Sequence, residues 1–507
     1  MPQNVIILFY PYVEKTNHNQ NIPYSLLYLE RALRDLDVEV LLLDERIHPN
    51  YEEIIIQNKD NLVLAGVSCM IGYQIVGAQH FTELIKKHTN SPILWGGWFP
   101  TAFSEIVLSE KSIDYICIGQ GETPLRELAI NLLNKEKPKQ ITGIVTSIKQ
   151  LKDANKLNLK SLKTLPKINL KLIDINKIID LNGKVEKVNR GTDYIATMGC
   201  PYNCSFCNLP FIYDKKWFHI PIKQIISDLI YLKHNANITH ITFSDDNFFV
   251  TRSFVLELCT EIIEHKINIT WEANAHVKLF LSRFNDKDIA FIKKAGCVKL
   301  KFGAESGDQN ILNLIDKKTT VAENFKMLKV LNKHKINSRI YTMIAFPEAP
   351  KRDTNLTLSF ITKAKLIYPN IDLNINVFKP VPKTALYTLA QEYGFNYPKT
   401  IPKLLNFLNE EMTYPWHNIN YNKLVYVYSN VNYHFLNKNI CNNKYKLQEK
   451  ISCYFIKSLF KISTLFRLKF NCWEKPLGAL LYLFLINKRY RNNGTEDVGI
   501  TKLRNNN

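Results

Sequence analysis

The feature that most constrains the fold of this 507-residue chain is a repeated alternation of short apolar runs with longer amphipathic segments. The runs have the length of β-strands, and the segments between them carry apolar residues at helical spacing. Parallel strands need a crossover connection, which is usually a helix, so the alternation predicts an α/β fold with parallel sheets. It occurs twice, over residues 4–134 and again from Asp193, which predicts two α/β units.

The first block predicts a doubly wound, Rossmann-like domain over residues 1–135. Ligands of such sheets bind beyond the carboxyl ends of the strands, so the loops that follow the apolar runs are the candidate binding segments. The expected strands are Val5–Tyr10, Val38–Asp44, Leu62–Ser68, Ile93–Trp95 and Tyr115–Ile118.

The second block predicts a partial (β/α)6 TIM-type barrel over residues 191–385. Six apolar runs alternate with helical patterns, and the chemistry of such barrels lies at the carboxyl ends of the strands. The expected strands are Tyr194–Met198, His240–Ser244, Ile269–Ala275, Val298–Gly303, Arg339–Ile344 and Leu373–Phe378.

The remaining segments lack this alternation. Residues 136–190 are rich in Lys, Asn and Leu, and we interpret them as a linker. Residues 386–507 are expected to be basic and mainly helical; residues 400–507 hold 16 Lys and Arg against 6 Asp and Glu, about half of the net charge of +20. The amphipathic segment Ile451–Phe470 and the apolar run from Leu477 could lie on an anionic membrane. The alternative is a helical cap over the barrel mouth.

Composition points to the cytoplasm. Ten cysteines in a chain of this length are not a disulfide framework, and the N-terminus has no signal-peptide pattern. No apolar run reaches the roughly 18 residues of a membrane-spanning helix. We expect a cytoplasmic protein, with the C-terminal region as a candidate contact to the inner membrane face. No RNA-binding module is recognisable, so nucleic acid is not an expected partner.

Three cysteines form the strongest motif. The segment after Gly199 reads CPYNCSFCN, which spaces Cys200, Cys204 and Cys207 as CxxxCxxC at the end of an expected strand. Soft thiolates suit iron–sulfur clusters, and three ligands for a [4Fe–4S] cluster leave one iron open for a further ligand. A zinc site would need a fourth ligand, and His219 is not at a suitable spacing.

This segment resembles the signature of the radical S-adenosylmethionine (SAM) superfamily, including the aromatic Phe206 before the last cysteine. The resemblance implies SAM-binding residues at later strand ends. Asp245 and Asp246 would contact the amino group of SAM, Glu305 would bind the ribose hydroxyls, and Ile344 would lie beside adenine.

The resemblance also implies the chemistry. A reduced [4Fe–4S] cluster donates an electron to SAM, which yields methionine and a 5′-deoxyadenosyl radical that abstracts hydrogen from an unactivated position. The protein orients the cofactors and excludes water. An electron donor such as flavodoxin or ferredoxin is implied as a partner.

The first domain is similar to the cobalamin (B12)-binding domain of B12-dependent radical SAM proteins. The similarity rests on the segments 66–70, 95–98 and 114–122, where paired glycines permit close approach of a ligand. The cobalamin-binding residues implied are Ser68, Met70, Gly96, Gly97, Gly119, Gly121 and Glu122.

The loop after the first strand departs from the corrinoid fingerprint. DxHxxG is expected there, whereas this chain reads Thr16-NHNQN, so His18 has neither the preceding Asp nor the following Gly. A histidine without an orienting carboxylate is a poor axial ligand, and we interpret His18 as a surface residue. Phe99 stands where such relatives often have His.

Together these features predict a cobalamin-dependent radical SAM enzyme, a methyltransferase that acts on an unactivated carbon. The alternatives are a radical cyclase or rearrangement enzyme without methyl transfer, and a non-catalytic corrinoid- or cluster-binding sensor. The substrate would be a small or lipid-like molecule. The other cysteines form no short motif and are interpreted as free thiols; they are Cys69, Cys117, Cys259, Cys297, Cys441, Cys453 and Cys472.

Overall fold

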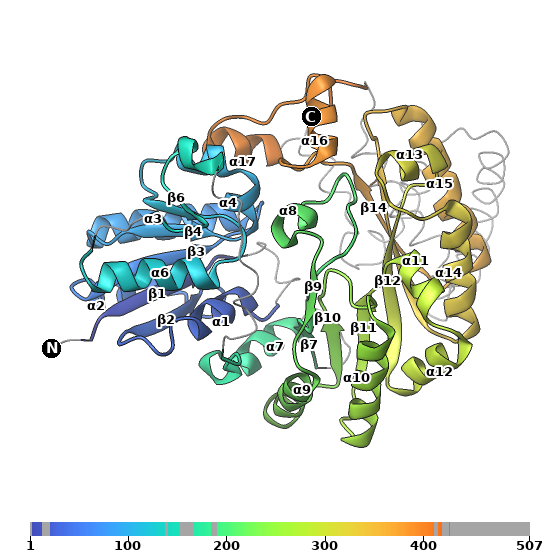
Figure 1. Ribbon diagram of the computed structural model, residues 1–507, viewed down its shortest axis with the longest axis horizontal. Coiled ribbons are helices and arrows are strands. Elements are labelled where there is room, and N and C mark those ends of the chain that lie inside the picture. The colour runs from blue at the N-terminus through green and yellow to red at the C-terminus, as the bar shows by residue number, and fades with distance from the viewer. Residues whose placement is uncertain are drawn as a thin grey trace, which may run out of the picture.

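The computed structural model consists of two parallel-sheet units side by side, as Figure 1 shows. It describes residues 3–12, 21–136, 140–152, 166–183, 190–409, 414–417 and 425.

The N-terminal sheet has the strand order β2-β1-β3-β4-β5-β6. Its first five strands are parallel, and β6 pairs antiparallel with β5. The strands are β1 (Val5–Tyr10), β2 (Glu39–Asp44), β3 (Leu62–Ser68), β4 (Ile93–Gly96), β5 (Tyr115–Cys117) and β6 (Ile144–Val145).

Helices cover both faces of this sheet because successive side chains of a strand point to opposite faces. On one face Phe9 stacks on Phe81, with ring centroids 4.2 Å apart. On the other face Leu8 packs with Leu26 and Leu128. The expected doubly wound domain is therefore present. Its helices are α1 (Tyr24–Arg31), α2 (Tyr51–Gln57), α3 (Gln74–His88), α4 (Trp98–Ala102), α5 (Ser104–Leu108) and α6 (Glu122–Leu133).

The second sheet has six parallel strands in the order β14-β13-β12-β11-β10-β7, which is the expected open partial barrel. Its strands are β7 (Gly191–Tyr194), β10 (His240–Phe243), β11 (Thr270–Asn274), β12 (Cys297–Glu305), β13 (Asn337–Ile344) and β14 (Asp372–Val377).

Helices cover the outer face of the barrel and share one core with the strands. Sequence-encoded caps begin some of them: Asn285 forms a capping box with Asp288, and Thr320 forms one with Glu323. The helices are α9 (Ile222–Ala236), α10 (Arg252–Glu264), α11 (Val277–Arg283), α12 (Asp286–Lys294), α13 (Gln309–Leu314), α14 (Val321–Lys333) and α15 (Pro350–Ile367).

One expected strand was wrong. The run Tyr194–Met198 is not a single barrel strand, because β7 ends at Tyr194 and a new strand, β8 (Thr197–Gly199), pairs antiparallel with β9 (Trp217–His219). The side chain of Asp245 accepts a hydrogen bond from the backbone N–H of Thr197 and so fixes the chain where it leaves the sheet. The cysteine segment therefore lies in the connection between β8 and β9 and does not follow the first barrel strand directly.

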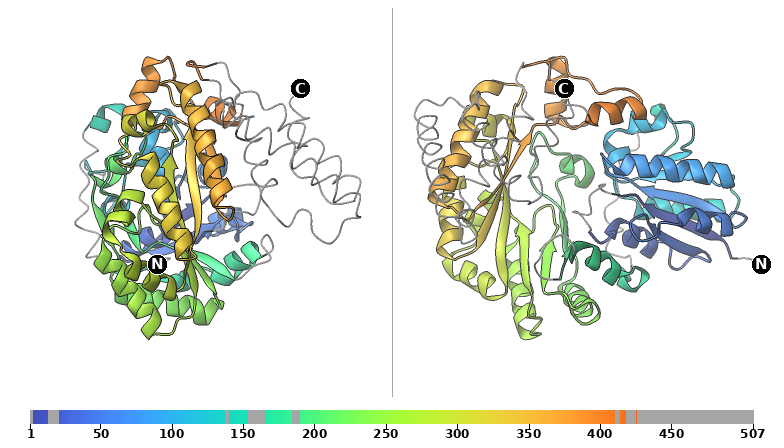
Figure 2. Two further views of the ribbon diagram at one scale, coloured as in Figure 1. Left: turned by 90° about the vertical axis from the view of Figure 1, so that its right-hand side faces the viewer. Right: turned by 180° about the vertical axis from the view of Figure 1, so that it is seen from behind.

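The segments outside the two sheets join them. The expected linker contributes β6 to the first sheet and α7 (Ile175–Gly183) to the core of the second, through Ile175 and Ile179. After the barrel come α16 (Ala385–Glu392) and α17 (Ile401–Asn409). Helix α17 returns to the first unit, as the ribbon in Figure 2 also shows. Its Ile401 and Leu404 are buried in the core of that unit.

Within the part of the chain that the structure describes, no helix is both long and apolar enough to cross a membrane. The segments Ile451–Phe470 and 477–486, for which membrane contact was considered, lie outside the described residues.

Candidate functional site

The cysteine loop begins at a glycine that no other residue could replace. Gly199 ends β8 with a φ of +82°, and a Cβ at this position would lie 2.3 Å from the backbone oxygen of Lys216. The backbone N–H of Gly199 donates to the Asp246 carboxylate at 2.9 Å. These contacts turn the chain from β8 into the loop between β8 and β9, which carries the three cysteines.

The loop is anchored on the barrel at both sides. The N–H of Ser205 donates to the Ile315 oxygen at 2.9 Å, and the Ser205 oxygen accepts from the N–H of Leu386 at 3.0 Å. The Tyr202 ring stacks on His276 with centroids 3.8 Å apart. Burial lowers the pKa of His276 to about 3, so this imidazole is neutral.

The three thiols are free and partly exposed, which suits ligands of a cofactor that must meet a second one. Burial raises the pKa of Cys204 to about 11 and that of Cys207 to about 12, so iron binding would have to remove their protons. Three thiols on one short loop are a donor set that fits a [4Fe–4S] cluster with one open iron. Among the described residues, no group of three or more His, Cys, Asp or Glu residues is arranged to hold a single metal ion.

The two carboxylates expected to contact SAM have different surroundings. Asp245 is 1% exposed, and its carboxylate accepts from the Thr197 N–H. Burial raises the pKa of Asp245 to about 7. Asp246 is exposed, and its carboxylate accepts from Gly199, next to Cys200. Asp246 is therefore the one of the two that is accessible to a ligand at the cysteine loop, whereas Asp245 braces the hairpin.

The other expected SAM residues lie at the carboxyl ends of β12 and β13. Glu305 ends β12 with a φ of +60°, and its Oε1 accepts from the Lys317 ammonium at 2.7 Å. That ammonium lies 5.9 Å from the centre of the Phe206 ring. Ile344 is fully buried at the end of β13, and its backbone oxygen accepts from the N–H of Phe378 at 2.9 Å. Lys317 was not singled out from the sequence, because a lysine in a loop looks like a surface residue.

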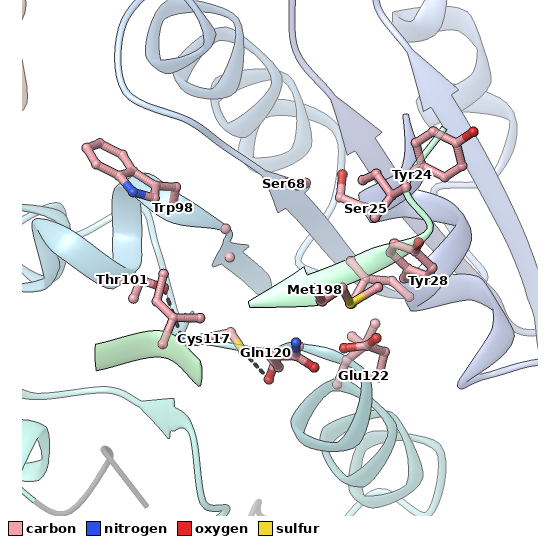
Figure 3. A pocket seen from close by; sticks show the side chains of 18 of the residues that line it. Tyr24, Ser25, Tyr28, Ser68, Trp98, Thr101, Cys117, Gln120, Glu122 and Met198 are labelled. Atoms are coloured by element: carbon pink, nitrogen blue, oxygen red, sulfur yellow. Dashed lines mark hydrogen bonds between the residues drawn. The ribbon is translucent and has the colours of Figure 1, made fainter. Parts of the chain in front are cut away.

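A cavity of about 370 Å³ lies at the carboxyl ends of the N-terminal strands and reaches the barrel. Six of the seven expected cobalamin residues line it: Ser68, Gly96, Gly97, Gly119, Gly121 and Glu122. Figure 3 shows side chains from both units around this space, among them Tyr28 of α1, Glu122 of α6 and Met198 of β8.

The polar groups of the cavity fit a ligand that has amide groups. Glu122 is buried and paired with Arg31 at 3.1 Å. The hydroxyl of Tyr28, which also lines the cavity, is buried without a hydrogen-bond partner among the described residues. A buried hydroxyl without a partner is costly, and an amide side chain of cobalamin could satisfy it.

Met70, the seventh expected residue, does not line this cavity. Its side chain is 53% exposed, because the chain turns after β3 and the Met70 N–H donates to Gln74 Oε1 at 2.7 Å. Phe99 is fully buried in the core of the domain. His18 lies outside the described residues.

The inner face of the barrel sheet is charged. Trp271 and Ala273 of β11 face the helices, so Glu272 between them faces inward. Lys301 lies 2.7 Å and Lys299 3.6 Å from the Glu272 carboxylate. Burial opposes ionisation of Glu272, but the two lysines outweigh it and hold the pKa below its usual value. Asp372 extends this network, 3.1 Å from Lys299.

Two protein families match separate segments of the chain. The radical SAM superfamily matches residues 194–361, and the B12 binding domain matches residues 16–129. The two matched segments correspond to the partial barrel and to the doubly wound domain.

Two curated relatives each match nearly three quarters of the chain at 24% identity. One is an uncharacterised methyltransferase of Pyrococcus horikoshii, where the match covers 73% of this chain and 78% of the relative. The other is an anaerobic magnesium-protoporphyrin IX monomethyl ester cyclase of Synechocystis, where the match covers 73% of each.

Two solved structures share the fold. The radical SAM methyltransferase TsrM from Kitasatospora setae, with cobalamin and a [4Fe–4S] cluster bound, has a TM-score of 0.62 at 15% identity and covers 77% of this chain and 75% of its own. The cobalamin-dependent SAM radical enzyme OxsB, with aqua-cobalamin and SAM bound, has a TM-score of 0.67 at 17% identity. It covers 98% of this chain and 77% of its own. At these identities the similarity is one of fold.

Proposed function

We propose that the chain, in which residues 194–361 match the radical SAM superfamily and residues 16–129 match the B12 binding domain, is a cobalamin-dependent methyltransferase that acts on an unactivated carbon of a polar small molecule. Its cofactors are a [4Fe–4S] cluster, SAM and cobalamin. When bound, they supply a 5′-deoxyadenosyl radical for hydrogen abstraction and a methyl group for transfer.

One observation supports this proposal: the residues on both sides of the cysteine loop line the cavity. Thr197 and Met198 of β8 line the cavity, and Cys200 follows two residues later. After Cys207, helix α8 (Leu209–Tyr213) lines the cavity again through Leu209, Ile212 and Tyr213. The cysteine loop and the wall of the cavity are thus continuous, so a corrinoid in the cavity would lie next to the cluster and its SAM.

The side chains at these sites have distinct roles in the proposal. Cys200, Cys204 and Cys207 hold the cluster, and Phe206 packs beside it. Glu305 Oε1 accepts a hydrogen bond from the Lys317 ammonium, and the other carboxylate oxygen would bind the ribose hydroxyls of SAM. Asp246 is exposed and bonded to Gly199, next to Cys200, and would contact the amino group of SAM. The side chain of Ile344 is buried in the core, so the backbone at the end of β13 would lie beside adenine.

The cavity residues would hold cobalamin mainly by shape and by hydrogen bonds. Gly96 and Gly119 line the cavity and have no side chains, so the macrocycle could approach the backbone at these strand ends. The N–H of Gly119 is already held by Thr101 Oγ1 at 2.9 Å, which fixes this turn. The hydroxyl of Tyr28 is available as a hydrogen-bond donor to the corrin side chains.

The charged inner face of the barrel favours a polar substrate over a lipid-like one. Glu272, Lys299 and Lys301 would have to lose water against an apolar molecule without gaining hydrogen bonds, which is unfavourable. A substrate with its own carboxylate, phosphate or amide groups could form ion pairs or hydrogen bonds with these residues.

Three further proposals come from the sequence alone. They are a cytoplasmic setting, flavodoxin or ferredoxin as the electron donor, and a membrane contact of the C-terminal region.

The similarity to a cyclase keeps a reaction without methyl transfer as the second candidate. Full-length protein reconstituted anaerobically with iron, sulfide and cobalamin separates the two through its SAM-derived products. Methyl transfer predicts S-adenosylhomocysteine that appears only when cobalamin is bound, together with 5′-deoxyadenosine. If 5′-deoxyadenosine forms and S-adenosylhomocysteine never does, with or without cobalamin, the cyclase-type reaction is favoured and methyl transfer is excluded.

A further inference from the structure

A buried lysine lies between the cysteine loop and the end of strand β12. Lys317 is 8% exposed and precedes α14, in a connection where lysines are usually solvated. Its Nζ donates to Glu305 Oε1 at 2.7 Å, and both side chains of the pair are 10% exposed. A buried charge needs such a partner, because the cost of removing it from water is large.

The fold makes room for this pair at a glycine. A Cβ on Gly303, two residues before Glu305 on β12, would lie 1.8 Å from Glu305 Oε1 and 2.9 Å from Lys317 Nζ. The ion pair therefore lies directly over the backbone of Gly303, in space that any other residue would fill. The backbone oxygen of Lys317 also contacts His276 Nε2 at 3.1 Å, which fixes the lysine from the other side.

The Lys317 ammonium also lies next to the cysteine loop. Its Nζ is 5.9 Å from the centre of the Phe206 ring, and Phe206 lies between Cys204 and Cys207 in the sequence. Burial disfavours its charge, but the partners of the ammonium, Glu305 first among them, outweigh burial and raise the pKa of Lys317. The ion pair with Glu305 therefore keeps Lys317 charged at neutral pH.

We propose that Lys317 is a positioning residue with two effects: it orients Glu305 toward SAM through Oε1, and its buried charge makes the cluster easier to reduce. The potential of an iron–sulfur cluster depends on the net charge around it, and a nearby cation stabilises the more negative, reduced state. Reduction of the cluster is the step that precedes SAM cleavage, so Lys317 acts on that step without touching the reacting atoms. This inference rests on the proposed cluster site.

The test uses full-length protein reconstituted anaerobically, with the midpoint potential measured by redox titration and electron paramagnetic resonance in the absence of SAM. Lys317→Met removes the charge and should shift the potential to more negative values. Glu305→Gln leaves the lysine charge uncompensated and should shift it to more positive values. The neighbouring Lys318→Met is the matched control, because Lys318 is exposed and pairs with Asp316; it should leave the potential unchanged.

SAM binding is the second readout. Loss of the hydrogen bond that orients Glu305 should weaken SAM binding to Lys317→Met by roughly tenfold, with iron content unchanged. An unaltered potential in Lys317→Met, or shifts of the same sign in Lys317→Met and Glu305→Gln, would overturn the inference. If Lys317→Met does not fold, the sign of the Glu305→Gln shift decides alone. Absence of a cluster from the wild-type protein would instead count against the proposed function.

Discussion

At the scale of single residues, the neighbouring carboxylates Asp245 and Asp246 illustrate what the sequence can and cannot reveal. Both follow the second strand of the barrel, and both were expected to contact SAM. Burial separates them, because Asp245 turns inward to hold the Thr197 N–H while Asp246 stays exposed beside Cys200. The hairpin that packs against these two acids determines which of them faces the ligand. The sequence pattern of the strand carries no information about this packing.

These two residues should respond differently to substitution. Asp246→Asn should weaken SAM binding by roughly 10- to 100-fold, because it removes a charge-assisted contact, and should leave the thermal stability near that of the wild type, because the amide oxygen can still accept from the Gly199 N–H. Asp245→Ala should lower the unfolding temperature, because it leaves the buried Thr197 N–H without its acceptor. Calorimetric titration with SAM and thermal unfolding measure the two effects. Equal losses of SAM affinity without loss of stability would show that both residues contact SAM.

At the scale of elements, the strands with a clear apolar period were predicted close to their observed bounds. Strands β1 and β3 coincide with the predicted Val5–Tyr10 and Leu62–Ser68. The prediction of a single strand over Tyr194–Met198 was wrong, because the apolar residues continue past Tyr194, where the chain leaves the barrel sheet for the small sheet of β8 and β9. Its second half pairs with Trp217–His219, some twenty residues later, and such pairing is set by tertiary contacts that a local pattern does not carry.

The end of strand β3 offers a matched pair of variants for cobalamin binding. Ser68 lines the cavity, whereas Met70 two residues later is 53% exposed and does not. Ser68→Leu should therefore obstruct the cavity and greatly reduce the cobalamin bound after reconstitution, while Met70→Leu should bind as the wild type does. Gly97 is unsuitable for this purpose, because a Cβ there would lie 2.8 Å from the Cys69 oxygen and strain the backbone. Full binding by Ser68→Leu, measured by absorption spectroscopy, would place cobalamin elsewhere.

At the scale of the whole molecule, segments that the sequence assigns to one region pack in the core of another. Tyr24 of α1 packs in the barrel core, and its hydroxyl donates to the Asp193 backbone oxygen at 3.0 Å. Helix α17, in the expected C-terminal region, packs in the N-terminal core. The sequence does not reveal these contacts, because an apolar helical face does not show which core it covers.

The exchange of α17 can be tested through stability. Leu404 is fully buried against the N-terminal core, so Leu404→Ala should lower the free energy of unfolding by about 2–5 kcal/mol. Asn406→Ala, on the exposed side of the same helix, is the control and should change it by less than about 0.5 kcal/mol. Denaturant unfolding measures both. A Leu404→Ala protein as stable as the control would mean that α17 does not contribute to this core in solution.

The most direct test of the account is anaerobic SAM cleavage by the reconstituted protein, with variants in which Cys200, Cys204 and Cys207 are changed to Ala. The wild type is expected to show iron–sulfur absorption and to form 5′-deoxyadenosine, and the triple variant is expected to show neither. Matched replacement of Cys259, a buried thiol far from the loop in the sequence, should retain both properties. A triple variant that keeps a normal cluster and still produces 5′-deoxyadenosine would contradict the account.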